Sequence, residues 1–169
     1  MKRQTGEETR GAAAAPPPNV LVLGVGNLLL GDDGFGVHLI RALADQPLPP
    51  NVRILEAGVV SHAFIPLFRE IDRLIVVDAV EAGDAPGSIF RFTPGDMAFG
   101  SERMVSLHQI GLIDVLQMAA WSGAKPETVI IGVQPKNVSA WSLELSPELG
   151  AAIPKVKALV LAELDRRIH

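Results

Sequence analysis

The chain has 169 residues and a mass of 18.0 kDa, which is enough for one domain with a sizeable core and too little for two full domains. Hydrophobic residues make up 48% and charged residues 20%, a globular rather than a disordered composition, and the net charge of −4 argues against nucleic-acid binding as the main task. The absence of cysteine excludes disulfides, thiolate metal sites and a cysteine nucleophile, and no apolar run approaches the roughly 20 residues that span a bilayer.

The first 18 residues differ from the rest of the chain. They contain no apolar residue larger than alanine after Met1, and they end in three prolines, which are incompatible with a helix interior or a strand ladder. The four alanines at 12–15 are too short and too weakly apolar for the hydrophobic region of a secretory signal. We therefore predict a disordered tail at 1–18, a single domain at 19–169 and a cytoplasmic location.

The predicted elements alternate between strands and helices. Continuous apolar runs predict strands buried on both faces, as in a parallel sheet, at 19–26, 52–57, 74–79 and 128–133. Residues 88–92 alternate instead, which is typical of an edge or antiparallel strand. Helical periodicity predicts helices at about 35–45, 63–69, 106–121 and from 146 onwards, with Pro154 breaking or kinking the last. We expect loops at 28–34 and 93–104. This order predicts an α/β fold with three layers: a mostly parallel, twisted sheet with helices on both faces.

The helix that opens near residue 106 carries a start signal. Ser106 followed by Gln109 matches a capping box, in which the serine hydroxyl and the glutamine side chain satisfy backbone N–H groups of the first turn. His108 lies within that turn. A helix N-terminus disfavours an imidazolium, so we expect a neutral ring that can act as a metal ligand.

Chemistry-bearing residues follow several of the predicted strands. Parallel sheets bind ligands beyond the carboxyl ends of their strands, and the first turn of the helix at 106–121 is expected near the same edge. The side chains that this rule selects are Asn27, Asp32, Asp33, Glu56, Asp78 and His108.

Each candidate also has a structural interpretation. Asp32 or Asp33 can cap the following helix, and Glu56 can be a solvated residue at a strand end. Asp78 follows four large apolar residues in an expected central strand, where a carboxylate must be paired, hydrogen-bonded or metal-bound. Two carboxylates and a neutral imidazole suit a divalent metal such as nickel or zinc. Among the other histidines, we expect His38 to face solvent, because it lies opposite the apolar stripe of its helix.

A nucleotide-binding interpretation remains open. Residues 24–27 read Gly-Val-Gly-Asn after the first strand, which is part of a dinucleotide fingerprint, and Glu56 stands where a ribose-binding acid would be. The fingerprint requires a third glycine at position 29, where this chain has Leu29. A Rossmann-type nucleotide or small-molecule domain is therefore the alternative.

Several motifs together resemble the hydrogenase maturation endopeptidases, which process the large subunit of nickel–iron hydrogenases. The resemblance is carried, over nearly all of residues 19–165, by VLGVGNLLLGDDGFGV at 22–37, VVDA at 76–79, SLHQIGL at 106–112, GVQP at 132–135 and LSP at 145–147. It implies an α/β peptidase that removes the C-terminal extension of the precursor once nickel is in place. The partner would be that precursor, and the nickel would be supplied by it.

The resemblance also implies a ligand set. The family binds metal through an acid after the first strand, an Asp ending a later strand and a His opening a helix, and these positions fall on Asp33, Asp78 and His108. The first of these is often Glu in the family, and Asp32 beside it can compete for the role. The family often has Asp after the second strand, where this chain has Glu56. The implied enzyme is an aspartyl-type or metal-dependent endopeptidase, and a metal checkpoint that binds the precursor without cutting it is a further alternative.

Overall fold

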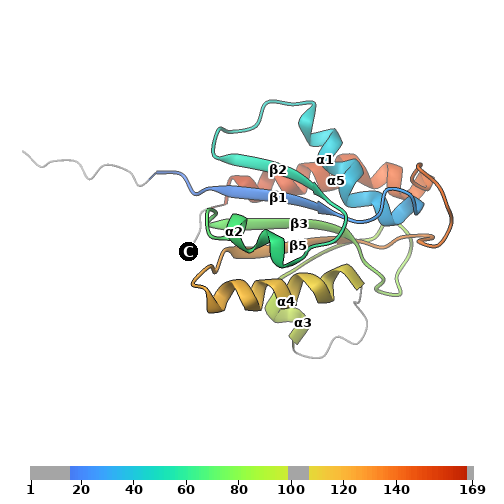
Figure 1. Cartoon of the computed structure of the whole chain (residues 1–169). Helices are drawn as coiled ribbons and strands as arrows, with labels where there is room; N and C mark the ends of the chain where they lie inside the picture. The colour runs from blue at the N-terminus through green and yellow to red at the C-terminus, as the bar shows by residue number, and fades with distance from the viewer. Residues whose placement is uncertain (1–15, 99–106, 167–169) are drawn as a thin grey trace, which may run out of the picture.

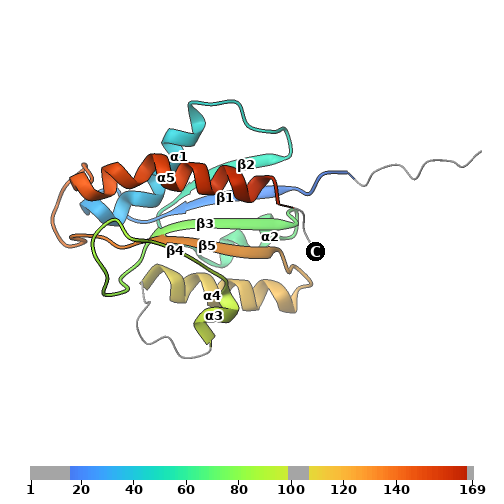
Figure 2. The ribbon, with the colours of Figure 1, turned by 180° about the vertical axis from the view of Figure 1, so that it is seen from behind.

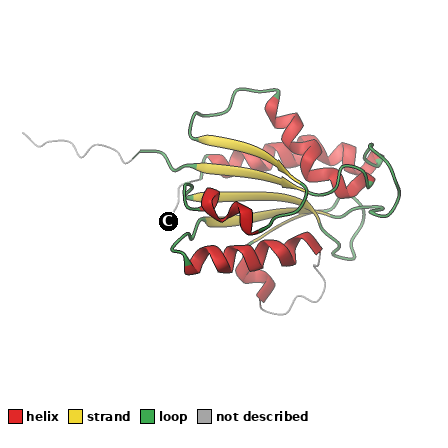
Figure 3. Cartoon of the chain, viewed as in Figure 1, coloured by secondary structure: helices red, strands yellow, loops and turns green. Residues whose placement is uncertain are grey.

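The computed structural model describes residues 16–98 and 107–166, with the side chains at 97–110 outside that description. Within these residues the chain forms a five-stranded sheet of order β2-β1-β3-β5-β4. Its strands are drawn in yellow in Figure 3. Its strands are β1 (Val20–Val25), β2 (Val52–Ala57), β3 (Arg73–Ala79), β4 (Ile89–Phe92) and β5 (Glu127–Val133). All neighbouring pairs are parallel except β4 and β5, so the predictions of a mostly parallel sheet and of an antiparallel edge strand at 88–92 are confirmed.

Helices cover both faces of this sheet, as the three-layer prediction requires (Figures 1 and 2). One face carries α1 (Phe35–Ala44) and α5 (Pro147–Leu164). The other carries α2 (Ile65–Phe68), α3 (Pro94–Ala98) and α4 (Leu107–Trp121). Two short 3-10 turns, η1 (Gly31–Gly34) and η2 (His62–Phe64), precede α1 and α2. Among the described helices, none is both long and apolar enough to cross a membrane.

The alternation of side chains along the strands divides the core into two halves. On β3, Ile75 and Val77 pack under α1 and α5, whereas Leu74 and Val76 pack with residues of α2 and α4. Because successive strand residues point to opposite faces, Asp78 belongs to the face that α4 covers. The carboxyl end of the central strand therefore offers a carboxylate to the α4 side.

Two glycines allow α1 to lie directly against the sheet. A Cβ on Gly36 would collide with the backbone oxygens of Val25 and Val77, and one on Gly24 would collide with the backbone of Gly36. The close approach holds the N-terminus of α1, and with it η1, over the ends of β1 and β3. These glycines thus place the loop at 27–34 at the carboxyl edge, the edge of the sheet where the parallel strands end.

A buried ion network holds the opposite, amino edge. Arg73, which is 2% exposed, donates from Nη2 to Oε2 of Glu163 at 2.6 Å and from Nη1 to the backbone oxygens of Glu163 and Arg166. Arg91 donates to the other carboxylate oxygen of Glu163 at 2.6 Å. Burial raises the pKa of the Glu163 carboxyl, but the hydrogen bond and charge of Arg91, with the charges of Arg166 and Arg73, outweigh it and hold that pKa below its usual range.

The prediction of a loop over 93–104 is wrong at 94–98, where α3 forms. Asp96 Oδ2 accepts hydrogen bonds from the backbone N–H of Thr93 at 2.7 Å and from its hydroxyl at 2.8 Å, and these two bonds lower the pKa of the Asp96 carboxyl. The pair thus supports the first turn of a helix that begins with Pro94, a residue whose missing N–H costs nothing at that position.

Of the two outcomes predicted at Pro154, the break is absent, because α5 is continuous from 147 to 164, and the kink stays a prediction. A proline inside a helix removes the hydrogen bond to the carbonyl four residues earlier. That carbonyl belongs to Gly150, which is exposed, so water can solvate it.

His38 is half-buried rather than solvent-facing, and its Nε2 is enclosed. The reason is that α1 packs against both the sheet and α5, so both of its flanks are covered.

Two further predictions fall partly outside the described residues. Of the tail, residues 1–15 lie outside, whereas the carbonyl of Pro18 accepts a hydrogen bond from Asn51 Nδ2 at 2.6 Å. Ser106 and the side chain of Gln109 lie outside as well, so the capping box stays a prediction.

Candidate active site

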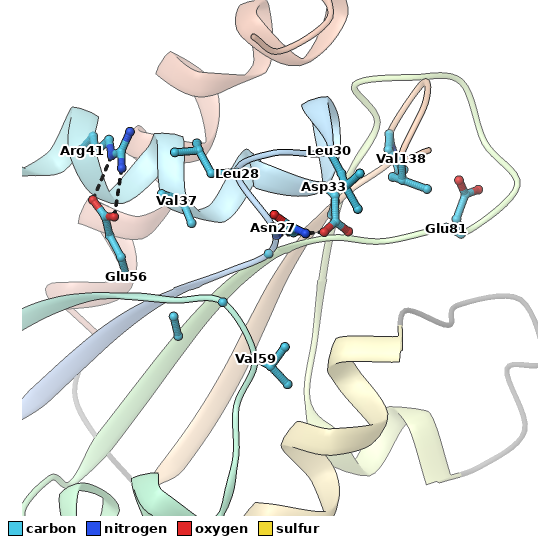
Figure 4. Close-up of a pocket in the computed structure, with 15 residues that line it drawn as sticks. Asn27, Leu28, Leu30, Asp33, Val37, Arg41, Glu56, Val59, Glu81 and Val138 are labelled. Carbon is cyan, nitrogen blue, oxygen red and sulfur yellow. Dashed lines mark hydrogen bonds and ion pairs between the residues drawn. The ribbon is translucent and has the colours of Figure 1, made fainter. Parts of the chain in front are cut away.

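A groove of about 810 Å³ lies at the carboxyl edge of the sheet, where β1, β2 and β3 end (Figure 4). Its centre is formed by Asn27 and Asp33, which follow β1. Glu56 at the end of β2 and Arg41 of α1 form one end, and Glu81, just after β3, stands toward the other. Asn27, Asp33 and Glu56, which the carboxyl-edge rule selects, all line this groove. Arg41 and Glu81 also line it, although the rule does not select them.

Asp33 is the acid that faces the groove. Its Oδ2 accepts a hydrogen bond from the backbone N–H of Asn27 at 2.8 Å, and the residue is half-buried. The turn that brings them together passes through Gly26, whose φ of 131° suits glycine and whose missing Cβ leaves room for the backbone of Asp33. The side chain of Asp33 is therefore anchored on one side while it remains accessible from the groove.

Asp32 has a different role, and the interpretation of Asp32 or Asp33 as a cap of the following helix is wrong for both residues. Asp32 is 2% exposed, and neither η1 nor α1 has a side-chain cap. Its carboxylate accepts four hydrogen bonds from the segment between β5 and α5. The donors are the backbone N–H groups of Lys136, Asn137 and Ser146 and the Ser146 hydroxyl, at 2.7–3.2 Å. Asp32 thus ties both ends of the 136–146 segment to η1, and its partners are too distant in sequence for a local pattern to reveal.

Asp78 lies near the carboxyl end of β3, which is flanked by β1 and β5, and it is 1% exposed. Its position confirms that the carboxylate is buried in a central strand. Such a group requires interactions with donors or a cation to remain charged.

His108 stands in the first turn of α4. Only residues 122–126 separate α4 from β5, so α4 ends at the amino edge. It has 15 residues, or about 22 Å at 1.5 Å per residue, a length that returns its first turn to the carboxyl edge. The imidazole itself is outside the described side chains. Among those that are described, no three His, Asp or Glu residues are grouped to hold a metal, so a site built from Asp33, Asp78 and His108 stays a prediction.

Glu56 is exposed but is not merely a solvated strand end. Its two carboxylate oxygens accept hydrogen bonds from Nε and Nη2 of Arg41 at 3.0 and 3.2 Å, as Figure 4 shows. The hydrogen bond and charge of Glu56 raise the pKa of the Arg41 guanidinium above its ordinary value. The pair places a positive and a negative side chain, bonded to each other, at one end of the groove.

Gln134 supports the groove from behind its lining, and the sequence analysis does not select it as a candidate. It is buried directly after β5, where its Oε1 accepts from the backbone N–H groups of Ala82 and Asp84 at 2.8 and 3.2 Å. Its Nε2 donates to Oε2 of Glu81 at 3.0 Å. Gln134 therefore holds the loop that carries Glu81 beside the groove. A signal was present, because an amide after a run of buried strand residues needs partners as Asp78 does.

Comparisons with known proteins identify the family. The family described as hydrogenase maturation protease matches residues 37–163. The chain belongs to this family. The hydrogenase expression/formation protein HupM of Azotobacter chroococcum is 38% identical over 154 residues, covering 89% of this chain and 73% of the relative. The fold of this chain matches that of the hydrogenase maturating endopeptidase HybD from E. coli, with a TM-score of 0.76 and 33% identity over 86% of this chain and 91% of HybD.

A second solved member of the hydrogenase maturation proteases has the same fold. The [NiFe] hydrogenase maturation protease HybD from Thermococcus kodakarensis superposes with a TM-score of 0.74 at 26% identity, over 87% of this chain and 99% of that one. The chain is thus an endopeptidase of the hydrogenase maturation protease family.

The family assignment displaces the nucleotide-binding alternative, and the local geometry agrees. In a dinucleotide site the glycine-rich turn leaves its face open to a pyrophosphate. Here a Cβ on Gly26 would lie 2.9 Å from the carbonyl carbon of Asp33, and one on Gly34 would lie 2.9 Å from Cα of Leu28. The chain's own backbone therefore occupies the space beside the turn.

Proposed function

We propose that this endopeptidase removes the C-terminal extension of the large-subunit precursor of a nickel–iron hydrogenase, after nickel has been inserted into that precursor. The family membership supports a peptidase acting in hydrogenase maturation. The observation that carries the proposal is the position of Asp33, an anchored yet accessible carboxylate at the centre of a groove on a peptidase fold. The groove volume of about 810 Å³ is sufficient for several residues of an extended peptide.

The precursor's nickel is part of the substrate in this proposal. Asp33 and Asp78 supply carboxylate oxygens, which are acceptable ligands for a divalent metal. Asp33 stands in the groove, and Asp78 lies on the face that α4 covers, with His108 in the first turn of that helix. We propose that these three side chains complete the coordination of nickel held by the precursor. When bound, the metal ties the precursor to the groove and can polarise a carbonyl group beside it.

Side chains of this protein then assist the hydrolysis of the scissile peptide bond. A water oxygen must bond to the scissile carbonyl carbon, the C–N bond must break, and a proton must reach the departing amine. We propose that a carboxylate at the site accepts the proton of that water as general base and then gives it to the departing amine nitrogen as the C–N bond breaks. Asp33, whose carboxylate the Asn27 N–H orients, is the candidate for this step in the case where nickel only registers the precursor and does not bind Asp33 itself.

A mass measurement tests the proposal against the metal-checkpoint alternative. Nickel-loaded and nickel-free precursors are each mixed with the protein and followed by intact mass. We expect loss of a C-terminal fragment only from the nickel-loaded precursor. A precursor that binds the protein while keeping its full mass would favour the checkpoint and contradict the proposal.

A further inference from the structure

Three large apolar side chains are exposed together beside the groove. They are Trp141 (81% exposed), Leu143 (60%) and Leu29 (49%), and we call them the apolar ledge. Backbone hydrogen bonds bring their two segments together: the N–H of Ser142 donates to the carbonyl of Leu29 at 3.1 Å, and the N–H of Gly31 donates to the carbonyl of Ser142 at 2.8 Å. The ledge is therefore one surface, although its two segments are more than 100 positions apart in the chain.

The ledge is continuous with the groove wall. Leu30, which forms a bridge with Ser142, lines the groove, and so does Val138 of the same segment as Trp141. Figure 4 shows Leu30 and Val138 near Asp33. The apolar ledge therefore lies directly beside the path of a chain that enters the groove.

The ledge is also held in place by buried bonds. Asp32 accepts hydrogen bonds from Lys136, Asn137 and Ser146, so the segment that carries Trp141 and Leu143 is tied at both ends. Within it, the Ser142 hydroxyl accepts from the N–H of Glu144 and donates to its carbonyl, each at 3.0 Å. Holding such side chains in water has no benefit for folding, whereas an ordered apolar surface with a tryptophan is typical of a protein-binding site.

We propose that the apolar ledge is the docking surface for the body of the precursor protein, and that it meets an apolar patch there. The inference rests on the proposed function, because it concerns the same substrate. It adds that recognition includes a folded surface outside the groove, next to the cleaved segment. The surface projects from a loop rather than forming a pocket, so it fits a protein surface better than a small molecule.

The chain contains two tryptophans, and the second provides a matched control. Trp121 is 86% exposed and ends α4 at the amino edge, away from the groove. Processing of nickel-loaded precursor is measured for the wild type, Trp141→Ala, Leu143→Ser and Trp121→Ala. We expect KM to rise at least tenfold for Trp141→Ala and severalfold for Leu143→Ser with kcat retained. Trp121→Ala should match the wild type. Melting temperatures of all three variants should stay close to that of the wild type.

A direct reading comes from protein labelled with 5-fluorotryptophan, in which only Trp121 and Trp141 carry fluorine. On adding unlabelled precursor, the Trp141 signal should lose its solvent isotope shift while the Trp121 signal keeps it. Normal cleavage by Trp141→Ala with an unchanged KM would contradict the proposal that the precursor docks on the apolar ledge. It would leave the proposed function unaffected. Failure of the wild type to cleave would instead overturn the proposed function. A wild-type dimer that Trp141→Ala converts to monomer, with KM unchanged, would assign the ledge to a second copy and overturn the inference.

Discussion

The buried carboxylate of Asp32 accepts two hydrogen bonds from Ser146, 114 residues further along the chain: Oδ1 from the backbone N–H at 2.7 Å and Oδ2 from the hydroxyl at 2.9 Å. The next residue, Asp33, turns its side chain toward the groove. The two adjacent acids thus have different roles: Asp32 holds the wall of the site, and Asp33 faces its centre.

Asp32→Asn tests the structural role of Asp32, which is to hold the 136–146 segment by hydrogen bonds. It removes a charged acceptor of four hydrogen bonds, and we expect it to lower the free energy of unfolding by about 1.5–3 kcal/mol, measured by urea denaturation. Ser146→Ala removes only the hydroxyl donor and should cost less, about 0.5–1.5 kcal/mol. Equal effects of the two variants would show that Asp32 does not hold the segment together.

Gly36→Ala tests the close packing of α1. The added Cβ meets the backbone oxygens of Val25 and Val77, which cannot move aside, so we expect a loss of about 1–3 kcal/mol. Gly150→Ala is the control, because it lies in α5 with nothing within 4 Å of its Cβ position. There alanine should stabilise the helix by about 0.5–1 kcal/mol. Denaturation curves in which both variants shift in the same direction would contradict this.

Glu163→Gln tests the buried ion network and its pH dependence. It leaves the buried Arg73 with only the longer contact to the more exposed Glu127, at 3.6 Å, and we expect a loss of about 3–5 kcal/mol at pH 7. Because folding lowers the pKa of Glu163, its contribution is present above the unfolded pKa of about 4.3 and is lost as the pH falls through the lower folded pKa. The difference in stability between the wild type and the variant should therefore begin to shrink as the pH falls below the unfolded pKa, and it should close only once the pH is below the lower folded pKa. The exposed Arg53–Glu70 pair provides the control, since Glu70→Gln should show little difference at either pH.

Deletion of residues 1–15 should leave both the melting temperature and precursor processing unchanged, because that segment has no large apolar residue after Met1 to dock. Deletion of 1–18 also removes the Pro18 carbonyl that accepts from Asn51, so this variant should melt lower. Calorimetry of the two truncations distinguishes them. A marked drop for the shorter deletion would show that the tail packs on the domain.

The sequence predicts the sheet well because the pattern of apolar residues in each strand indicates which of its faces are buried. The run Leu74–Val77 is apolar at every position, as a strand buried on both faces must be, and residues 88–92 alternate as an edge strand does. The carboxyl-edge rule then places Asn27, Asp33 and Glu56 at one groove without any contact being known.

The features that the sequence does not predict depend on distant partners or on short local caps. The four bonds of Asp32 go to residues more than 100 positions away, so its acid beside a helix was interpreted as a possible cap. The sequence at 94–98 suggests a loop because of Pro94 and Gly95, whereas the helix found there depends on the pairing of Thr93 with Asp96. The ion pair of Glu56 with Arg41 likewise depends on how α1 lies over β2.

The central proposal is that Asp33, Asp78 and His108 act as one unit on the nickel-bearing precursor. The most direct measurement is the rate of precursor cleavage by intact mass for Asp78→Asn, His108→Ala and their double variant. Asp45→Asn serves as a control, since this exposed acid ends α1 at the amino edge. We expect each single variant to remain folded and lose roughly 10²-fold or more in rate, and the double variant to be little slower than either single. Normal processing by Asp78→Asn, at a melting temperature equal to that of the wild type, would contradict the proposed site.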